Sequence, residues 1–208
     1  MIGQSEKSVG PEKSGAISSM QFSVGRPDMV RAISQRWLLK FWKRGLKDQA
    51  LPSWQTVEAE NLSRVADNLS YLEVTGESDV KRFQVRQHGR GVAKVYGAPD
   101  CSGRYLDEII PRPRHPTGLM PYYKAFSAGT PVYTICDVTD KDGRHILFER
   151  LILPFSNGGS AVGRIMSSCE FICEDGSYDA TSLVGLQHGA PNLRLCAMIQ
   201  AQQTTVAP

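Results

Sequence analysis

Several signals that would place a chain quickly in a functional class are missing from these 208 residues. No run of about 18 apolar residues occurs, so the sequence predicts no membrane-spanning helix. A strong excess of positive or negative charge is also missing, because 24 Lys and Arg and 21 Asp and Glu give a net charge of only +3. That excess is too small to predict a polyanion as partner of the whole chain. The N-terminal residues lack the apolar stretch of a signal peptide. We therefore expect a soluble cytoplasmic protein.

The five cysteines are odd in number and none forms a CxxC pair. They are Cys101, Cys136, Cys169, Cys173 and Cys196. This usage predicts reduced thiols. Cys169 and Cys173 lie four apart on a predicted strand, without the tight turn of a structural zinc knuckle. Adding Cys136 and either His88 or His145 makes a weak zinc set, so we expect buried thiols and no metal.

Composition divides the chain into three parts. Residues 1–27 are rich in Gly and Ser and predict a flexible lead-in. Residues 28–174 carry the periodic patterns of one folded domain with a leading helix. The remaining segment, 175–208, has few charges and is punctuated by Gly and Pro. We expect it to be a loosely packed tail with a short turn of helix over 192–200.

Apolar residues that recur every four positions predict the leading helix. Ile33, Trp37 and Phe41 form the stripe, Trp42 adjoins it, and Asp28 is a suitable N-cap. So much aromatic surface does not face water. We expect the stripe to pack on the outer face of a sheet or on a second copy, and we predict a homodimer through these four apolar residues.

The same region is basic. Residues 1–50 contain nine Lys and Arg and four Asp and Glu. A basic helix with exposed aromatic side chains can also lie on an anionic membrane or on nucleic acid. Both remain alternatives at this point, although neither is the expected partner.

Patterns of period two predict five strands, and patterns of period three to four predict helices between them. The strands are 69–75, 80–86, 130–139, 144–155 and 160–173. A short helix is predicted over 91–96, and a longer one follows Pro116, with Gly129 as its C-cap. A strand pair, a block of helices and three antiparallel strands predict an α+β fold with a five-stranded antiparallel sheet.

Several motifs follow one another in this order. They are Arg36-Trp37 with Phe41-Trp42, Leu51-Pro52-Ser53-Trp54, Gly89-Arg90-Gly91-Val92, Ser102-Gly103-Arg104-Tyr105-Leu106-Asp107-Glu108, Ala128-Gly129-Thr130-Pro131-Val132-Tyr133 and Glu149-Arg150-Leu151-Ile152-Leu153-Pro154-Phe155-Ser156. With the order of elements, they resemble the PAS domain superfamily, and in particular a bacterial PAS-like family of short stand-alone proteins. The resemblance covers roughly 30–173. It implies a PAS fold, a role in signal transduction, and a ligand cavity between the helical crossover and the inner face of the sheet.

The sequence assigns neither of two cofactors that PAS domains bind, flavin and haem. Flavin-binding photoreceptors carry Asn-Cys-Arg-Phe-Leu-Gln, whereas here two residues separate Cys101 from Arg104. Haem-binding members use a histidine on the long helix. His115 precedes Pro116 at the start of that helix, and is more simply a cap that faces solvent.

Signals for other chemistry are weak. The turn Gln87-His88-Gly89-Arg90-Gly91 lacks the spacing of phosphate-binding loops, and we interpret it as a tight turn with a glycine at positive φ. No G-x-S-x-G or H-E-x-x-H motif and no acid–base pair are present. Glu149 lies within an apolar strand and is expected to pair with a nearby arginine. We expect no enzyme.

The aromatic crossover is the predicted ligand site, because tyrosine offers an apolar wall with a hydrogen-bonding tip. The predicted lining is Tyr96, Tyr105, Leu119, Tyr122, Tyr123 and Phe126, with Cys136, Cys169 and Phe171 from the sheet. Few full charges are expected there, which suits a neutral or weakly polar small molecule. The alternative is a fully packed core.

Two functions follow from this prediction. In the first, the chain is a sensory protein that binds a small ligand and relays through contact with a signalling protein. In the second, it is a ligand-free PAS adaptor that mediates dimerisation or partner binding. The fold alone does not distinguish them.

Overall fold

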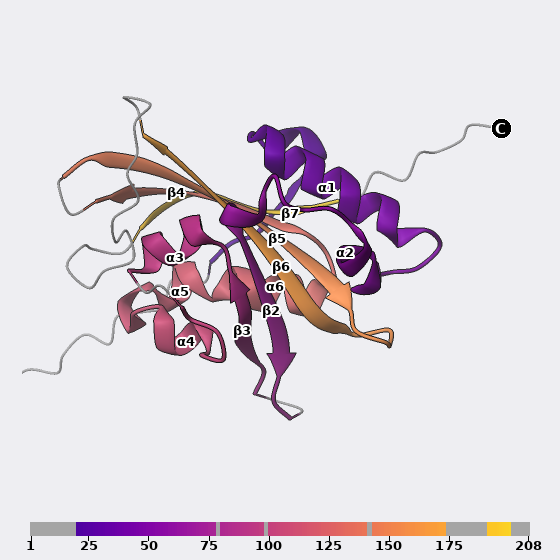
Figure 1. Ribbon diagram of the computed structural model, residues 1–208. Helices are drawn as coiled ribbons and strands as arrows, with labels where there is room; N and C mark the ends of the chain where they lie inside the picture. The colour runs from indigo at the N-terminus through magenta and orange to yellow at the C-terminus, as the bar shows by residue number, and fades with distance from the viewer. Residues whose placement is uncertain (1–19, 78–79, 98–99, 141–142, 174–190, 201–208) are drawn as a thin grey trace, which may run out of the picture.

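One twisted sheet runs through the molecule, with helices on both of its faces (Figure 1). The computed structural model describes residues 20–77, 80–97, 100–140, 143–173 and 191–200. Helices α1 (Ile33–Leu46) and α2 (Gln55–Ala59) cover the outer face. The inner face carries α3 (Arg90–Tyr96), α4 (Leu106–Ile109), α5 (His115–Gly118) and α6 (Met120–Ala128).

The sheet has the strand order β1-β7-β4-β5-β6-β2-β3. The five predicted strands are β2 (Leu69–Thr75), β3 (Arg82–His88), β4 (Val132–Thr139), β5 (His145–Ser156) and β6 (Val162–Cys173). They are contiguous in the sheet, and each neighbouring pair is antiparallel. A hairpin, a helical crossover and a three-stranded meander follow one another, so the fold is PAS-like, as predicted.

Two further strands correct the predicted sheet of five. β7 (Asn192–Ile199) pairs antiparallel with β4, and β1 (Ser23–Gly25) pairs parallel with β7. The short turn of helix predicted over 192–200 is therefore wrong. The physical reason is the exposed edge of β4, whose backbone groups need partners. β7 supplies them and buries Cys196, Ala197 and Ile199.

Helix α1 packs on the outer face of the sheet with Leu38, Leu39, Phe41 and Trp42, all at most 5% exposed. The Trp42 indole Nε1 donates to the carbonyl oxygen of Pro154 over 2.6 Å. The predicted dimer interface is therefore wrong for Phe41 and Trp42, because both fill the core between α1 and the sheet. Ile33 and Trp37 remain on the surface, 78% and 38% exposed.

The buried face of α1 includes Gln35, which is fully buried. Its amide Nε2 donates to the carbonyl oxygens of Glu149 and Ser168, at 3.3 and 3.1 Å. These bonds attach α1 to β5 and β6. The N-cap of the helix is Ala32, four residues later than the predicted Asp28, because Asp28 belongs to a 3-10 turn, Pro27–Met29, that starts at a proline.

Candidate functional site

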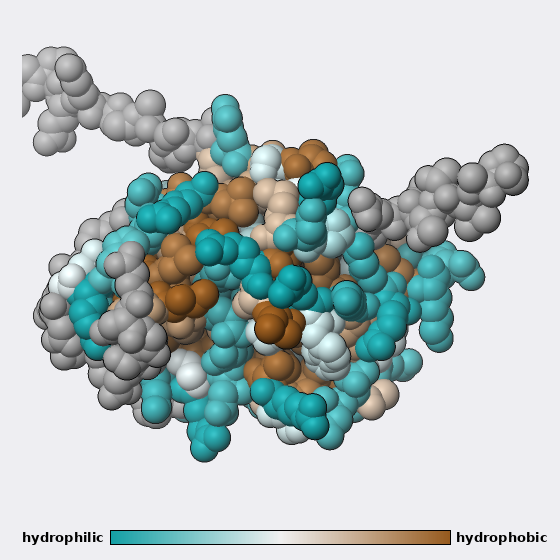
Figure 2. All heavy atoms as spheres, turned by 90° about the horizontal axis from the view of Figure 1, so that it is seen from above, coloured by the Kyte–Doolittle hydropathy of each residue, from teal (hydrophilic) through white to brown (hydrophobic). Residues whose placement is uncertain are grey.

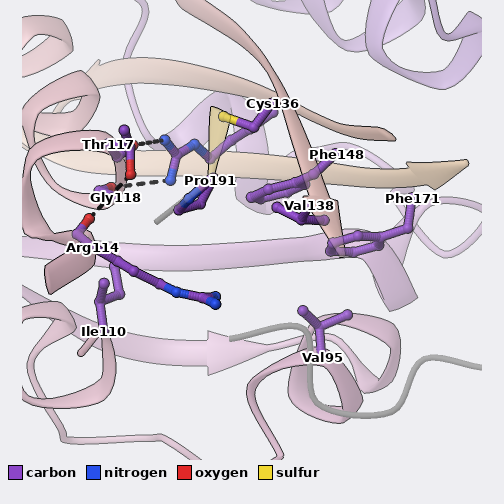
Figure 3. Close-up of a pocket in the computed structure, with 11 residues that line it drawn as sticks. Val95, Ile110, Arg114, Thr117, Gly118, Cys136, Val138, Phe148, Phe171 and Pro191 are labelled. Carbon is purple, nitrogen blue, oxygen red and sulfur yellow. Dashed lines mark hydrogen bonds between the residues drawn. The ribbon is translucent and has the colours of Figure 1, made fainter. Parts of the chain in front are cut away.

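A cavity lies between the inner face of the sheet and the helical crossover (Figure 3). Its volume is about 40 Å³. Its lining is mainly apolar and comes from α3, the α4–α5 region, three strands and the residue that precedes β7. The residues are Val95, Ile110, Arg114, Thr117, Gly118, Cys136, Val138, Phe148, Arg150, Phe171 and Pro191.

Strand register places the sheet residues of this lining on one face. Cys136 of β4 pairs with Phe148 of β5, and Phe148 pairs with Phe171 of β6. Side chains of paired residues point to the same face of a sheet. The Phe148 and Phe171 rings are stacked, with centroids 4.9 Å apart and planes 10° from parallel. These two rings form an aromatic wall of the cavity.

Arg150 ties β5 to the crossover. It is 2% exposed, and its Nη1 and Nη2 donate to the carbonyl oxygens of Gly118 and Thr117, at 3.0 and 2.9 Å. Its guanidinium also lies over the Tyr122 ring, 5.0 Å from the centroid. Backbone carbonyls at the end of α5 are thereby satisfied by a cation, as helix ends favour.

Arg114 is the second charged residue of the lining, 5% exposed. Burial lowers the pKa of its guanidinium. Figure 3 shows its side chain extending into the space between Val138 and Phe148 on one side and Ile110 on the other. Two arginines thus contribute to a cavity for which few full charges were expected.

Of the predicted ligand residues, Cys136 and Phe171 line this cavity. Tyr122 and Leu119 are buried beside it, and the Tyr122 hydroxyl lies 3.0 Å from the Ser167 hydroxyl oxygen. The hydroxyl of Tyr123 donates to the Lys81 carbonyl oxygen, also over 3.0 Å. Both hydroxyl groups are thus engaged by the chain itself.

The other predicted ligand residues pack elsewhere in the fold or lie outside its described part. Cys169 is 2% exposed on the inner face, and Phe126 packs at the edge of the main core. The Tyr105 ring lies 3.6 Å from the Arg82 guanidinium, at the contact between α4 and β3. Tyr96 belongs to α3, and its side chain lies outside the described part of the chain. The predicted set is therefore dispersed, and two of its members meet at the cavity.

The prediction missed Val95, Ile110, Val138, Phe148 and the two arginines. Alternation along the strands could have identified two of them, since Val138 and Phe148 share the face of Cys136 and Phe171. A charged residue within a strand is usually exposed to solvent, so the sequence pattern assigns it to the surface. Nothing in the local sequence marks Arg114 or Arg150 as buried.

The five cysteines are free and buried. Desolvation raises the pKa of Cys169 to about 11 and that of Cys196 to about 12. Thiols with such pKa values stay protonated at neutral pH, and are weak nucleophiles and poor metal ligands. Among the described residues, no group of three or more His, Cys, Asp or Glu side chains is arranged to hold a metal ion.

The cysteine considered for a flavin and the histidine considered for haem both lie outside the cavity lining. Cys101 is buried in the main core. The imidazole Nε2 of His115 lies 2.9 Å from the carbonyl oxygen of Ile110, so a backbone group already occupies it.

The glycine-containing turn after β3 departs from the prediction of positive φ. Gly89 has φ −66° and caps the N-terminus of α3. It must be glycine for a different reason, because a Cβ at this position would overlap the backbone carbonyl oxygens of Ala66 and Asp67.

We predict that Gly89→Ala destabilises the protein by about 1–3 kcal/mol, since the added methyl group forces two backbone segments apart. Gly159→Ala is the matched control, because a Cβ there meets no atom within 4 Å. Urea denaturation measures both variants. Equal stability of the two would refute the close-approach explanation.

Buried His88, next to that glycine, makes the stability of the protein depend on pH. Burial lowers its pKa to about 4, against a smaller opposing effect of Asp100. The unfolded chain, with a His pKa of about 6.5, binds the proton more readily. The stability contributed by neutral His88 is therefore complete above pH 6.5 and lost as the pH falls to about 4.

We expect this effect to amount to about 1–3 kcal/mol. It is measured as the free energy of unfolding at pH 7 and pH 4.5, for wild type and His88→Gln. The variant should lose less stability on acidification. His145→Gln is the control, with a side chain that is 45% exposed, and an identical acid response of all three proteins would contradict the assignment.

No helix of the described chain is long and apolar enough to cross a membrane. Comparison with protein families gives no matching family model, and comparison with curated proteins gives no match. Solved structures do match. A light-oxygen-voltage domain studied with a flavin analogue is 17% identical over 58% of this chain and 87% of its own, with a TM-score of 0.40.

Two other solved structures are similar to the same extent. The dark structure of the blue-light photoreceptor Aureochrome1 LOV is 15% identical over 60% of this chain and 87% of its own, with a TM-score of 0.40. An RNA-binding light-oxygen-voltage receptor is 19% identical over 55% of this chain and 32% of its own, with a TM-score of 0.37. The PAS-like character of this chain follows from its own strand order.

Proposed function

We propose that this chain is a PAS-like sensory domain in which a small, weakly polar molecule binds the cavity between the sheet and the crossover, and contact with another protein carries the output. The observation that supports this proposal is the shared lining. Helix α3, the α4–α5 region and strands β4, β5 and β6 all contribute side chains to one apolar cavity. A molecule bound there contacts both layers of the fold at once.

The lining sets the class of ligand. Phe148 and Phe171 present a stacked aromatic pair, and Val95, Ile110 and Val138 add aliphatic surface. An aromatic or short acyl compound matches such a surface. Because the volume is about 40 Å³, the ligand enters as a small group or by displacing lining side chains.

Strand β5 links the cavity with the outer face of the sheet, because its successive side chains point to opposite faces. Phe148 and Arg150 point to the cavity, and Glu149 between them points to α1. The Glu149 side chain is fully buried and accepts a hydrogen bond of 2.7 Å from the Tyr133 hydroxyl. Its Oε1 lies 3.6 Å from Nε of Arg31. In this proposal, a shift of β5 on ligand binding alters these contacts and the hydrogen bond by which Gln35 of α1 binds the Glu149 carbonyl oxygen.

A cavity-filling variant tests ligand binding. Thermal shift and native mass spectrometry are measured with indole, benzoate and short fatty acids on wild type, Val138→Phe and Tyr123→Phe. We expect at least one compound to raise the Tm of wild type and of Tyr123→Phe, whose hydroxyl lies outside the cavity. Val138→Phe should abolish the shift. Compounds that stabilise all three proteins equally would refute this site.

The ligand-free adaptor is the second candidate function. The cavity volume of about 40 Å³ favours it, and so do the hydroxyls of Tyr122 and Tyr123, which find partners within the chain. No stabilisation by any compound, with unchanged protein contacts in Val138→Phe, would leave the adaptor as the function. In either form we propose a cytoplasmic binding protein without enzymatic activity.

The homodimer predicted from the sequence is untested, and of its four predicted interface residues only Ile33 and Trp37 are exposed. Sedimentation velocity of wild type and Trp37→Asp tests it. A dimer that dissociates in the variant would support it, and a monomeric wild type would refute it.

A further inference from the structure

A groove on the outer side of the molecule is lined by the first half of α1 and by the segment that follows α2. Its volume is about 460 Å³. We call it the α1 groove, and its lining is Ile33, Ser34, Trp37, Asn61, Leu62, Ser63, Arg64 and Val65. Ile33 and Trp37 are the large apolar side chains that α1 leaves exposed. The Trp37 ring is stacked on Phe41, with planes 10° from parallel, so it is held in place before any partner arrives.

Cations continue from this groove along the solvent face of α1. Arg36, Lys40 and Arg44 are exposed on the helix, and Lys47 is exposed directly after it. Helix α1 contains no acidic residue, and none of these four cations forms an ion pair among the described residues. Figure 2 looks onto the α1 side of the molecule, and shows hydrophilic side chains across this face with small hydrophobic patches between them.

We propose that the α1 groove and the adjacent cations bind an acidic amphipathic helix of a partner protein. Apolar side chains of that helix fill the groove against Ile33 and Trp37, and its carboxylates lie over Arg36, Lys40 and Arg44. An aromatic anchor beside an apolar groove is a typical centre of binding energy. A row of unpaired cations next to it selects a partner of opposite charge and accelerates association. This interaction does not require a ligand in the inner cavity, because the groove and the cavity share no lining residue.

Charge disfavours a second copy of the chain as occupant. A symmetric contact through α1 would place the cations of one copy near those of the other. Like charges brought together in an interface are unfavourable. No acidic residue of α1 is available to compensate for them.

The buried apolar face of α1 disfavours a membrane. A helix that lies in a bilayer surface inserts its whole apolar face, whereas Leu38, Leu39 and Trp42 are at most 3% exposed in the core. Nucleic acid offers phosphates to the cations, but no aliphatic side chains to fill a groove beside Ile33.

The test uses a fluorescein-labelled helical peptide with Leu and Trp on one face and Glu on the other. A scrambled peptide of the same composition is the control ligand, and binding to the full chain is followed by anisotropy at 50 and 300 mM salt. Two triple variants are compared, Arg36→Glu/Lys40→Glu/Arg44→Glu and the control Lys94→Glu/Arg104→Glu/Arg112→Glu. The control variant changes the net charge by the same amount as the α1 variant, and its three residues are exposed on the helical crossover, away from α1. Trp37→Ala tests the groove.

We expect the amphipathic peptide to bind wild type at least tenfold more tightly than the scrambled one, and more weakly at high salt. Affinity should fall at least tenfold in the α1 triple variant and in Trp37→Ala, and less than threefold in the control triple variant. Equal affinity for both peptides, equal loss in both triple variants, or no binding would overturn the proposal. If the chain did not prefer the amphipathic peptide to the scrambled one, any of three other results would identify a different occupant and overturn the proposal. These are binding of phosphatidylglycerol vesicles, binding of an RNA oligonucleotide, and self-association that depends on Trp37.

Discussion

Replacing Trp42 by alanine should lower the free energy of unfolding by about 3–5 kcal/mol, the range of buried aromatic deletions. Trp42 is 3% exposed between α1 and the sheet, where its indole nitrogen donates to Pro154. The variant loses apolar burial, leaves a cavity, and removes a hydrogen bond from a buried carbonyl group.

Trp37→Ala is the matched control, since it removes the same side chain from the same helix at a position that is 38% exposed. We expect it to cost less than about 1 kcal/mol. Urea denaturation followed by circular dichroism measures both. Similar losses in the two variants would show that α1 is not held to the sheet as described.

Arg150→Ala should have a comparable effect, about 3–5 kcal/mol. Each hydrogen bond from a charged group contributes about 1.5–3 kcal/mol, and Arg150 donates one to Thr117 and one to Gly118. Its removal leaves both buried carbonyl groups without these donors and detaches β5 from the crossover.

Arg164→Ala on the neighbouring strand is the control for this variant. Arg164 is 24% exposed, lies over the Trp54 ring and pairs loosely with Glu73 at 3.9 Å. We expect a loss below about 1.5 kcal/mol. Arg150→Lys should recover part of the stability. If Arg150→Ala proved no more costly than Arg164→Ala, the link between β5 and α5 would be unimportant for stability.

The sequence predicted strands β2 to β6 and the crossover because their patterns agree with their environments. Phe83 and Val85 alternate along β3 and are both buried, the apolar run Leu151-Ile152-Leu153 of β5 is buried throughout, and the glycine at 97 ends α3 at positive φ. In α1 the predicted stripe of Ile33, Trp37 and Phe41 does not coincide with the buried face, because Ile33 and Trp37 are exposed. The face that is buried runs through Gln35, and a glutamine is not counted as apolar even when its amide satisfies two backbone carbonyls.

The candidate site was less predictable for a related reason. Which tyrosine hydroxyl points to a cavity depends on partners distant in sequence, such as Ser167 for Tyr122 and Lys81 for Tyr123. Burial of Arg150 depends on carbonyl groups at the end of α5, 32 and 33 residues away. Periodicity reports which residues share a face, and does not report these distant contacts.

The parallel pair of β1 and β7 also has a consequence for synthesis of the chain. Ser23 pairs with Ala197, and the amide of Gln200 donates to the carbonyl oxygen of Gly25. Residues 23–25 therefore have no partner strand until residues 197–199 have been synthesised. While the ribosome is still adding the segment up to 199, the edge of β4 is open and β1 has no strand beside it. An open edge is a template for pairing with other chains, so β4 is where a nascent or C-terminally truncated chain is expected to aggregate or to recruit a chaperone.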